Sequence, residues 1–258
     1  MSNQYIDEER NYWFLSKLGK RVLRPGGKEL TLRLLENLQI SSNDDVVEFA
    51  PGTGYTAMKV LKKHPKSYTG VEINEEAGEN LRQKIHGKGQ KIIIANVSHI
   101  EMENNTASKI LGEAILTMHA DHRKTEIIRE AHRLLKKGGL YGIHELGLYP
   151  PELSEDFKAQ MRRELSLSAK VNAKPLSEAE WITLIEKEGF AVRKVMTSPM
   201  LLLEPLRVID DEGLYRTLKI GMNILYFREA RKRILEMRKL FRKYRNQMNA
   251  IAIVAEKV

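Results

Sequence analysis

The sequence predicts an α/β fold: a doubly wound, mostly parallel sheet of seven strands, with a helical N-terminal extension and a helical insertion before the last strand. Two observations predict it. Apolar runs rich in β-branched residues recur along the chain, and helical periodicity fills most of the intervals between them. Strands that alternate with helices pair in parallel, because a parallel connection needs a crossover long enough to hold a helix.

The predicted core follows this alternation from residue 46 to residue 146. Each apolar run leads into a helical segment, except that only a short link separates the third run from the fourth. The predicted strands are VVEFA (46–50), YTGVEI (68–73), KIIIANV (91–97), EAILTM (113–118) and LYGIHEL (140–146), and the predicted helices are Tyr55 to Lys63, Glu75 to Ile85 and Asp121 to Lys136.

Helix-end signals support this division of the chain. RLLKKGG, at 133–139, would end a helix with lysines in its last turn and glycine just beyond. Ser177 and Glu180 form a capping box that opens a helix, and Gly189 would end that helix. A further strand begins after Gly189 and is interrupted near Pro199.

We expect a single domain. A long helical stretch separates the last two predicted strands, so we expect it to form an insertion over one edge of the sheet. Within the domain, 1–258, the expected parts are a helical extension (1–40), a cofactor-binding core (41–150) and the substrate-side helices with the last two strands (151–258), which include the insertion (205–247).

The composition of the chain excludes several kinds of site. The chain has 258 residues, 42% of them hydrophobic, and no cysteine, which excludes disulfides, thiolate metal sites and cysteine nucleophiles. We expect no metal. The N-terminus lacks a basic segment followed by an apolar one, and no run of about eighteen apolar residues occurs, so we expect a cytoplasmic protein. The net charge of +9 is concentrated in 228–245, which holds nine basic residues against Glu229 and Glu236.

The glycine loop after the first strand predicts a nucleotide site. Gly52 and Gly54 begin a GxGxxG/A pattern, and Glu72 lies twenty residues beyond Gly52, where an acid binds ribose hydroxyls. Glu48, at the end of the first strand, would repel the pyrophosphate of NAD but attract a cation. S-adenosylmethionine carries an ammonium and a sulfonium and no phosphate, so Glu48 favours it over NAD.

At these residues the sequence resembles the class I S-adenosylmethionine-dependent methyltransferases, and particularly the branch that acts on small molecules. Residues 46–54, VVEFAPGTG, match the first motif of that family, with Ala50 in place of the first glycine. The resemblance implies that Glu72 binds the ribose, that Ile73 lies against the adenine, and that Asn96 with Val97 receives the adenine amino group. The expected cofactor-binding residues are Arg24, for the cofactor carboxylate, and Glu48, Ala50, Pro51, Gly52, Gly54, Tyr55, Glu72, Ile73, Asn96, Val97 and Met118.

Later segments carry the same resemblance. EAILTMHADH (113–122) resembles the fourth strand and its active-site end, and REAHRLLKKGGLYGIHE (129–145) resembles the following helix, turn and fifth strand, with Lys137 where proline is usual. PLSEAEWITLIEKEGFAVRKV (175–195) resembles the helix and strand after a substrate-facing insertion. Several ordered motifs make this resemblance more specific than the glycine loop alone.

The resemblance implies methyl transfer to a small-molecule acceptor by in-line displacement at the sulfonium. His119 and His144 are candidate general bases, and packed or exposed structural roles are the alternative for both. A base is not required when the acceptor is already nucleophilic, because positioning supplies most of the advantage. Tyr12, Trp13 and Phe14 either wall the acceptor pocket or pack as an ordinary helix.

The basic segment 228–245 has two interpretations. Apolar side chains recur in it at three- and four-residue steps, which favours an amphipathic helix packed on the domain with a solvated basic face. The alternatives are an RNA, a weak anionic-surface contact or a paired helix in a homodimer, and we expect no sequence-specific nucleic-acid recognition. The competing functions are therefore an RNA-binding or anionic-surface-binding methyltransferase and an NAD-dependent oxidoreductase. The apolar positions are Phe227, Ala230, Ile234, Met237, Phe241, Tyr244 and Met248.

Overall fold

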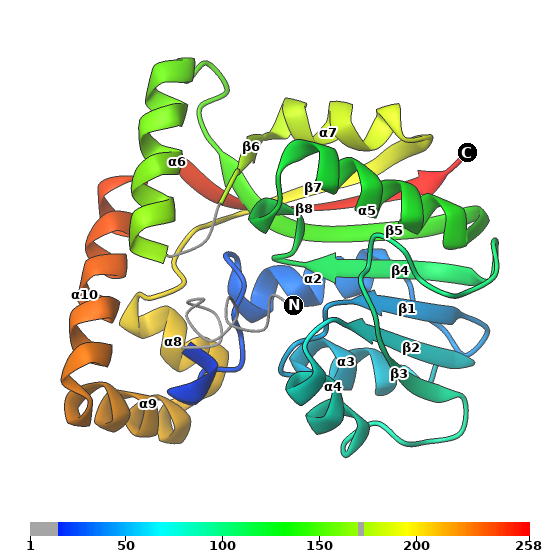
Figure 1. Cartoon of the computed structure of the whole chain (residues 1–258), viewed down its shortest axis with the longest axis horizontal. Helices are drawn as coiled ribbons and strands as arrows, with labels where there is room; N and C mark the ends of the chain where they lie inside the picture. Colours follow the sequence, from blue (N-terminus) through cyan, green and yellow to red (C-terminus); the bar gives the residue numbers. More distant parts are fainter. Residues whose placement is uncertain (1–14, 170–172) are drawn as a thin grey trace, which may run out of the picture.

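A central sheet with helices on both faces forms the core of the computed structural model, which describes residues 15–169 and 173–258 (Figure 1). The strand order is β3-β2-β1-β4-β5-β8-β7, and the two-residue β6 pairs with β5. β8 runs antiparallel to both β5 and β7, and the other pairs are parallel. The strands are β1 (Asp45–Phe49), β2 (Ser67–Glu72), β3 (Gln90–Ile94), β4 (Ala107–Glu113), β5 (Leu135–Leu148), β6 (Leu176–Ser177), β7 (Phe190–Pro199) and β8 (Met248–Lys257).

The helices cover the two faces of the sheet and bury a separate apolar core on each. One core packs α5 and α7 against the sheet, and the other packs α2, α3 and α4 against the opposite face. The doubly wound fold predicted from the alternation of strands and helices is confirmed. The helices are α2 (Gly27–Asn37), α3 (Tyr55–Leu61), α4 (Glu75–Arg82), α5 (Asp121–Leu134), α6 (Glu155–Ala169), α7 (Glu178–Lys187), α8 (Pro205–Glu212), α9 (Leu214–Tyr226) and α10 (Arg228–Lys243), with a 3₁₀ turn, η1 (Leu116–Met118).

The fourth strand differs from its prediction. We predicted it over 113–118, but β4 ends at Glu113, and Leu116 lies in η1. Residues 113–118 are more apolar than the strand before them because the turn η1 is itself buried, at Leu116 and Thr117. The prediction that lysines occupy the last turn of this helix is also wrong. Lys136 and Lys137 lie in β5, which begins at Leu135, directly after α5 ends at Leu134.

The predicted insertion before the last strand consists of α8, α9 and α10. Figure 1 shows these helices together on the left, beyond the carboxyl end of β4. The apolar positions predicted for α10 are buried at Ala230, Ile234, Met237 and Tyr244, which supports packing on the domain, whereas Phe227 is exposed. None of the helices within the described ranges combines the length and apolar character needed to cross a membrane.

Candidate active site

The glycine loop joins β1 to α3 at the carboxyl edge of the sheet. Three of its residues have left-handed backbones, with φ of 51° at Ala50, 55° at Gly52 and 82° at Gly54. Alanine adopts this conformation at a cost that glycine avoids, so Ala50 keeps the loop geometry despite the missing first glycine. A Cβ atom at Gly52 would have only the Ala50 carbonyl oxygen near it, at 3.9 Å. The loop therefore has open space beside Gly52.

Glu72, at the end of β2, is tied to this loop. Its Oε2 accepts a hydrogen bond from the backbone N–H of Gly52 at 3.0 Å, and its Oε1 accepts one from Asn74 at 3.1 Å. The following side chain, Ile73, is 59% exposed, although it is large and apolar. The structure thus places a fixed carboxylate and an exposed apolar surface beside the glycine loop.

Asn96 and Val97 follow β3 at the same edge of the sheet. Asn96 is exposed, and its Oδ1 accepts hydrogen bonds from the backbone N–H and the hydroxyl of Ser98, both at 3.0 Å. Val97 is buried in the core beneath. Asn96 therefore shapes a turn, and its role with a cofactor stays a prediction.

The sequence analysis treated Glu48 as negatively charged, but its surroundings in the structure favour the neutral form. It is buried, and the Tyr68 hydroxyl donates a hydrogen bond to its Oε2 at 2.8 Å. Burial raises the pKa of Glu48 to about 8, against the Tyr68 hydrogen bond that lowers it and with a further rise from the neighbouring Glu113. Burial thus favours the neutral form of Glu48, and a nearby cation would favour its ionised form.

Glu113, which the sequence analysis missed, is the centre of a buried polar cluster at the end of β4. Its Oε1 accepts hydrogen bonds from Thr31, at 2.5 Å, and from His144 Nδ1, at 2.8 Å. Its Oε2 accepts one from Thr56 and lies 3.5 Å from Arg24 Nη1. Burial would raise the pKa of Glu113, but Arg24 and the hydrogen-bond donors lower it to about 2.

His144 lies inside this cluster and has both ring nitrogens engaged. It is fully buried, donates from Nδ1 to Glu113, and accepts the backbone N–H of Gly26 at Nε2, at 3.1 Å. Burial lowers the pKa of His144, although Glu113 opposes this. Acceptance of the Gly26 N–H at Nε2 requires the neutral ring. This geometry favours the structural alternative of the two that the sequence left open.

Arg24 lies against the first turn of α3. Its Nη1 donates to Thr56 Oγ1 at 2.8 Å, and its guanidinium carbon lies 5.3 Å from the centre of the Tyr55 ring. Two buried carboxylates of α8 hold the segment around Arg24 in place. Glu212 accepts the backbone N–H of Val22 at 2.8 Å, and Asp211 accepts that of Lys28, also at 2.8 Å.

Another buried carboxyl group, that of Glu145 on β5, fixes the loop that carries Met118 and His119. Its oxygens accept three backbone N–H groups, those of residues 115–117, at 2.8 to 3.0 Å, and the hydroxyl of Thr117 at 2.7 Å. Both Met118 and His119 are partly exposed at the end of η1. Glu113 and Glu145 could have been noticed in the sequence, because each is an acidic residue next to an apolar run.

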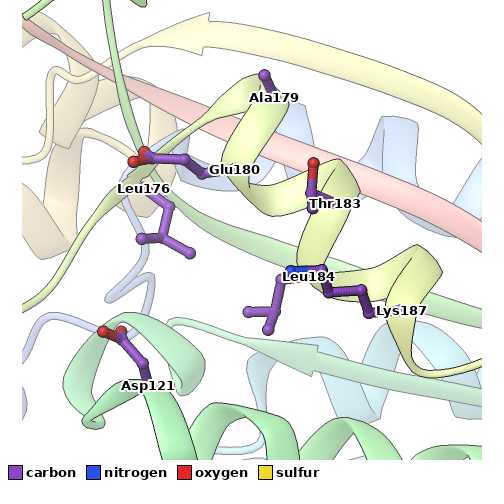
Figure 2. Close-up of a pocket in the computed structure, with 7 residues that line it drawn as sticks. All are labelled: Asp121, Leu176, Ala179, Glu180, Thr183, Leu184 and Lys187. Carbon is purple, nitrogen blue, oxygen red and sulfur yellow. The ribbon is translucent and has the colours of Figure 1, made fainter.

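Figure 2 shows a pocket away from these residues, between α5 and α7. Its volume is about 340 Å³. Leu176 and Leu184 form an apolar floor, and charged side chains from Asp121, Glu180 and Lys187 lie around it. The pocket includes none of the expected cofactor-binding or catalytic residues. The predicted aromatic wall, Tyr12, Trp13 and Phe14, lies outside the described residues.

Comparison with known sequences identifies methyltransferases as relatives of this chain. A family profile described as a methyltransferase domain matches residues 46–139. The chain is 31% identical over 254 residues to an uncharacterized protein of Haemophilus influenzae, across 97% of this chain and 99% of that protein. It is 25% identical over 141 residues to the phosphoethanolamine N-methyltransferase of Plasmodium falciparum, across 54% of this chain but only 52% of that protein.

Comparison with solved structures gives the same fold. Phosphoethanolamine N-methyltransferase 2 of Haemonchus contortus, in complex with phosphomonomethylethanolamine and S-adenosylhomocysteine, superposes with a TM-score of 0.71 at 17% identity. The match covers 99% of this chain and 59% of that one. The same enzyme with S-adenosyl-L-methionine gives a TM-score of 0.69 at 18% identity, across 95% and 56% of the two chains.

Proposed function

Because the chain belongs to the class I S-adenosylmethionine-dependent methyltransferases, we propose that it transfers the methyl group of S-adenosylmethionine to a small-molecule acceptor. The observation that carries this proposal is the position of Glu72, whose carboxylate is fixed by the N–H groups of Gly52 and Asn74 beside an open glycine loop. A carboxylate there accepts ribose hydroxyls, and Ile73 offers an apolar surface to the adenine.

The residues present fit this cofactor. The loop around Gly52 leaves room for it. Arg24 is held beside the loop by Thr56 and Glu113, and we propose that its remaining N–H groups meet the cofactor carboxylate. Glu48 can ionise next to a cation, which a pyrophosphate would not provide. When bound, S-adenosylmethionine supplies an electrophilic methyl group on its sulfonium.

The chain's own contribution is to position the reactants and to exclude water. Glu145 fixes the turn that carries His119, and α8 holds the segment around Arg24 against the glycine loop. Orientation of this kind supplies a large part of the rate advantage of a displacement reaction. We propose His119 as the general base where the acceptor needs deprotonation, and His144 as a positioning residue for Glu113.

A small acceptor is supported by the Plasmodium falciparum relative, which is named for the methylation of phosphoethanolamine. It is also supported by the arrangement of the insertion, whose helix α8 contacts the segment next to the glycine loop through Glu212. A cover of this kind limits the size of the molecule that can reach the cofactor.

Calorimetry with S-adenosylhomocysteine tests the cofactor site. Glu72→Ala should weaken binding by at least about tenfold, because each charge-assisted hydrogen bond contributes about 1.5–3 kcal/mol. The matched control is Glu79→Ala, which removes an exposed carboxylate of the neighbouring α4 and should leave the affinity unchanged. Equal affinity of Glu72→Ala and the wild type would exclude this binding mode.

A further inference from the structure

Helix α9 presents its apolar side chains to the outside of the molecule. Their exposed fractions run from 60% at Leu218 to 89% at Tyr226. An exposed helix of a globular protein normally turns its polar face outward. A continuous row of large apolar side chains on the outer face of a helix marks an interaction surface. The row consists of Leu214, Tyr215, Leu218, Met222, Leu225 and Tyr226.

The inner face of α9 fixes this orientation. Ile220 is buried, and Asn223 Nδ2 donates to the Leu18 carbonyl oxygen at 3.1 Å. Thr217 Oγ1 donates to the Val208 carbonyl oxygen at 3.2 Å. Rotating the helix to hide its apolar row would break these hydrogen bonds and expose Ile220. The outward apolar face is therefore held by the fold.

Exposed basic side chains lie on α9 itself and on the first turns of the helix that follows it. Lys219 lies on α9, and Arg228, Arg231 and Lys232 lie in the first turns of α10; all four are exposed. Within the described parts of the chain, no carboxylate forms an ion pair with any of them. Glu229 is the one acidic side chain among these positions of α10. Two further large apolar side chains are exposed nearby in sequence: Leu206 of α8, at 81%, and Phe227, which follows α9, at 57%.

We propose that the outer face of α9 docks on the surface of an anionic lipid bilayer. A helix of thirteen residues is about 20 Å long, so it would lie in the plane of the interface rather than cross the bilayer. Leucine, methionine and aromatic side chains then enter the boundary between headgroups and acyl chains. Tyr215 and Tyr226 have an apolar ring and a polar hydroxyl, a combination that is enriched at this depth.

The basic side chains of α9 and α10 favour an anionic bilayer over a second copy of the chain as the partner. A two-fold symmetric interface pairs a surface with itself, so Arg228, Arg231 and Lys232 would face a copy of a surface on which Glu229 is their one acidic neighbour. Like charges at an interface oppose association. Anionic lipid headgroups attract the same side chains, because the surface potential of such a bilayer is negative.

Co-sedimentation of the full chain with vesicles tests the proposal. We expect binding to vesicles of phosphatidylglycerol and phosphatidylcholine, weaker binding to phosphatidylcholine alone, and release by added salt. Arg231→Glu with Lys232→Glu should weaken binding to the anionic vesicles by about 25-fold or more, since each of the two basic residues near the surface contributes about fivefold. Lys62→Glu with Lys63→Glu changes the charge equally on exposed residues near the end of α3, and should reduce binding less.

The apolar row is tested by Tyr215→Ser with Tyr226→Ser, which should weaken vesicle binding about tenfold or more. Leu167→Ser, at a 73% exposed position on α6, is the matched control and should bind as the wild type does. Three results would overturn the proposal: no binding by the wild type, a dimer that Tyr215→Ser with Tyr226→Ser converts to a monomer, or full vesicle binding by that variant.

Discussion

Two buried carboxyl groups at the carboxyl ends of neighbouring strands ionise in opposite ways. Glu48 on β1 pairs in register with Leu111 of β4, and Glu113 lies two residues further along β4. Tyr68 donates a hydrogen bond to Glu48, whose pKa rises to about 8 through burial. Glu113 is also buried, but Arg24, His144 and two threonine hydroxyls lower its pKa to about 2.

The comparison of Glu48 with Glu113 shows that burial alone does not determine whether a carboxyl group is charged. Burial acts on both groups in the same direction, toward the neutral form. The charge of Glu113 is maintained because Arg24 supplies a cation inside the protein. Arg24 also lowers the pKa of Glu48, but less than burial raises it, because the ion pair of Arg24 is with Glu113. Glu113 is thus part of the scaffold, and a response of Glu48 to a bound ligand stays a prediction.

The largest expected effect is the loss of Glu113. Glu113→Ala leaves Arg24 buried without its carboxylate, and removal of one partner from a buried ion pair costs about 3–5 kcal/mol. Chemical denaturation measures this change in the free energy of unfolding. Glu79→Ala, which breaks an ion pair with Arg82 that is exposed on both sides, should cost at most about 1 kcal/mol. Similar losses in the two variants would remove the distinction drawn for Glu113.

The next effect concerns Glu48 between about pH 4.5 and pH 8. Its folded pKa lies above the ordinary value of 4.5, so its contribution to stability is complete below pH 4.5 and is lost as the pH rises to about 8. Glu48→Gln does not titrate. The stability of this variant relative to the wild type should therefore increase across that range, as followed by urea denaturation at several pH values. A constant difference would mean that Glu48 ionises normally.

A smaller effect of opposite sign is expected for Glu113 in acid. Its folded pKa of about 2 lies below 4.5, so the stability it contributes is complete above pH 4.5 and is lost as the pH falls toward 2. Glu113→Gln should be less stable than the wild type at pH 7 and lose less stability on acidification. Glu204, which also has a pKa of about 2, keeps part of the acid sensitivity in both proteins. Parallel acid transitions would contradict the assignment.

The smallest effect is a proton released on cofactor binding. If a cation settles beside Glu48, its pKa falls and the carboxyl group loses less than one proton per site at neutral pH. Calorimetry in buffers of different ionisation enthalpy measures that release. S-adenosylmethionine should release more than S-adenosylhomocysteine, which lacks the sulfonium, and Glu48→Gln should release none. A binding heat independent of the buffer would show that Glu48 does not sense the ligand.

The sequence by itself determined the features that depend on short stretches of chain. The alternation of strands and helices, the left-handed glycines of the loop and the capping box of Ser177 with Glu180 all follow from local backbone chemistry. The position of Glu72 twenty residues after Gly52 was also readable, because the first two strands are neighbours in the sheet. It failed at β4, where the more apolar segment, 113–118, is mostly a buried turn and not a strand.

Only the tertiary structure decided the states of the buried polar groups and the direction of the helix faces. Arg24 precedes α2 and Thr56 lies in α3, yet both contact Glu113, so the charge at the end of β4 depends on residues distant in sequence. His144 loses its availability as a base for the same reason, through contacts with Gly26 and Glu113. The apolar row of α9 faces outward because Asn223 is held against the N-terminal segment. Through-space partners set each of these properties, and spacing along the chain does not reveal them.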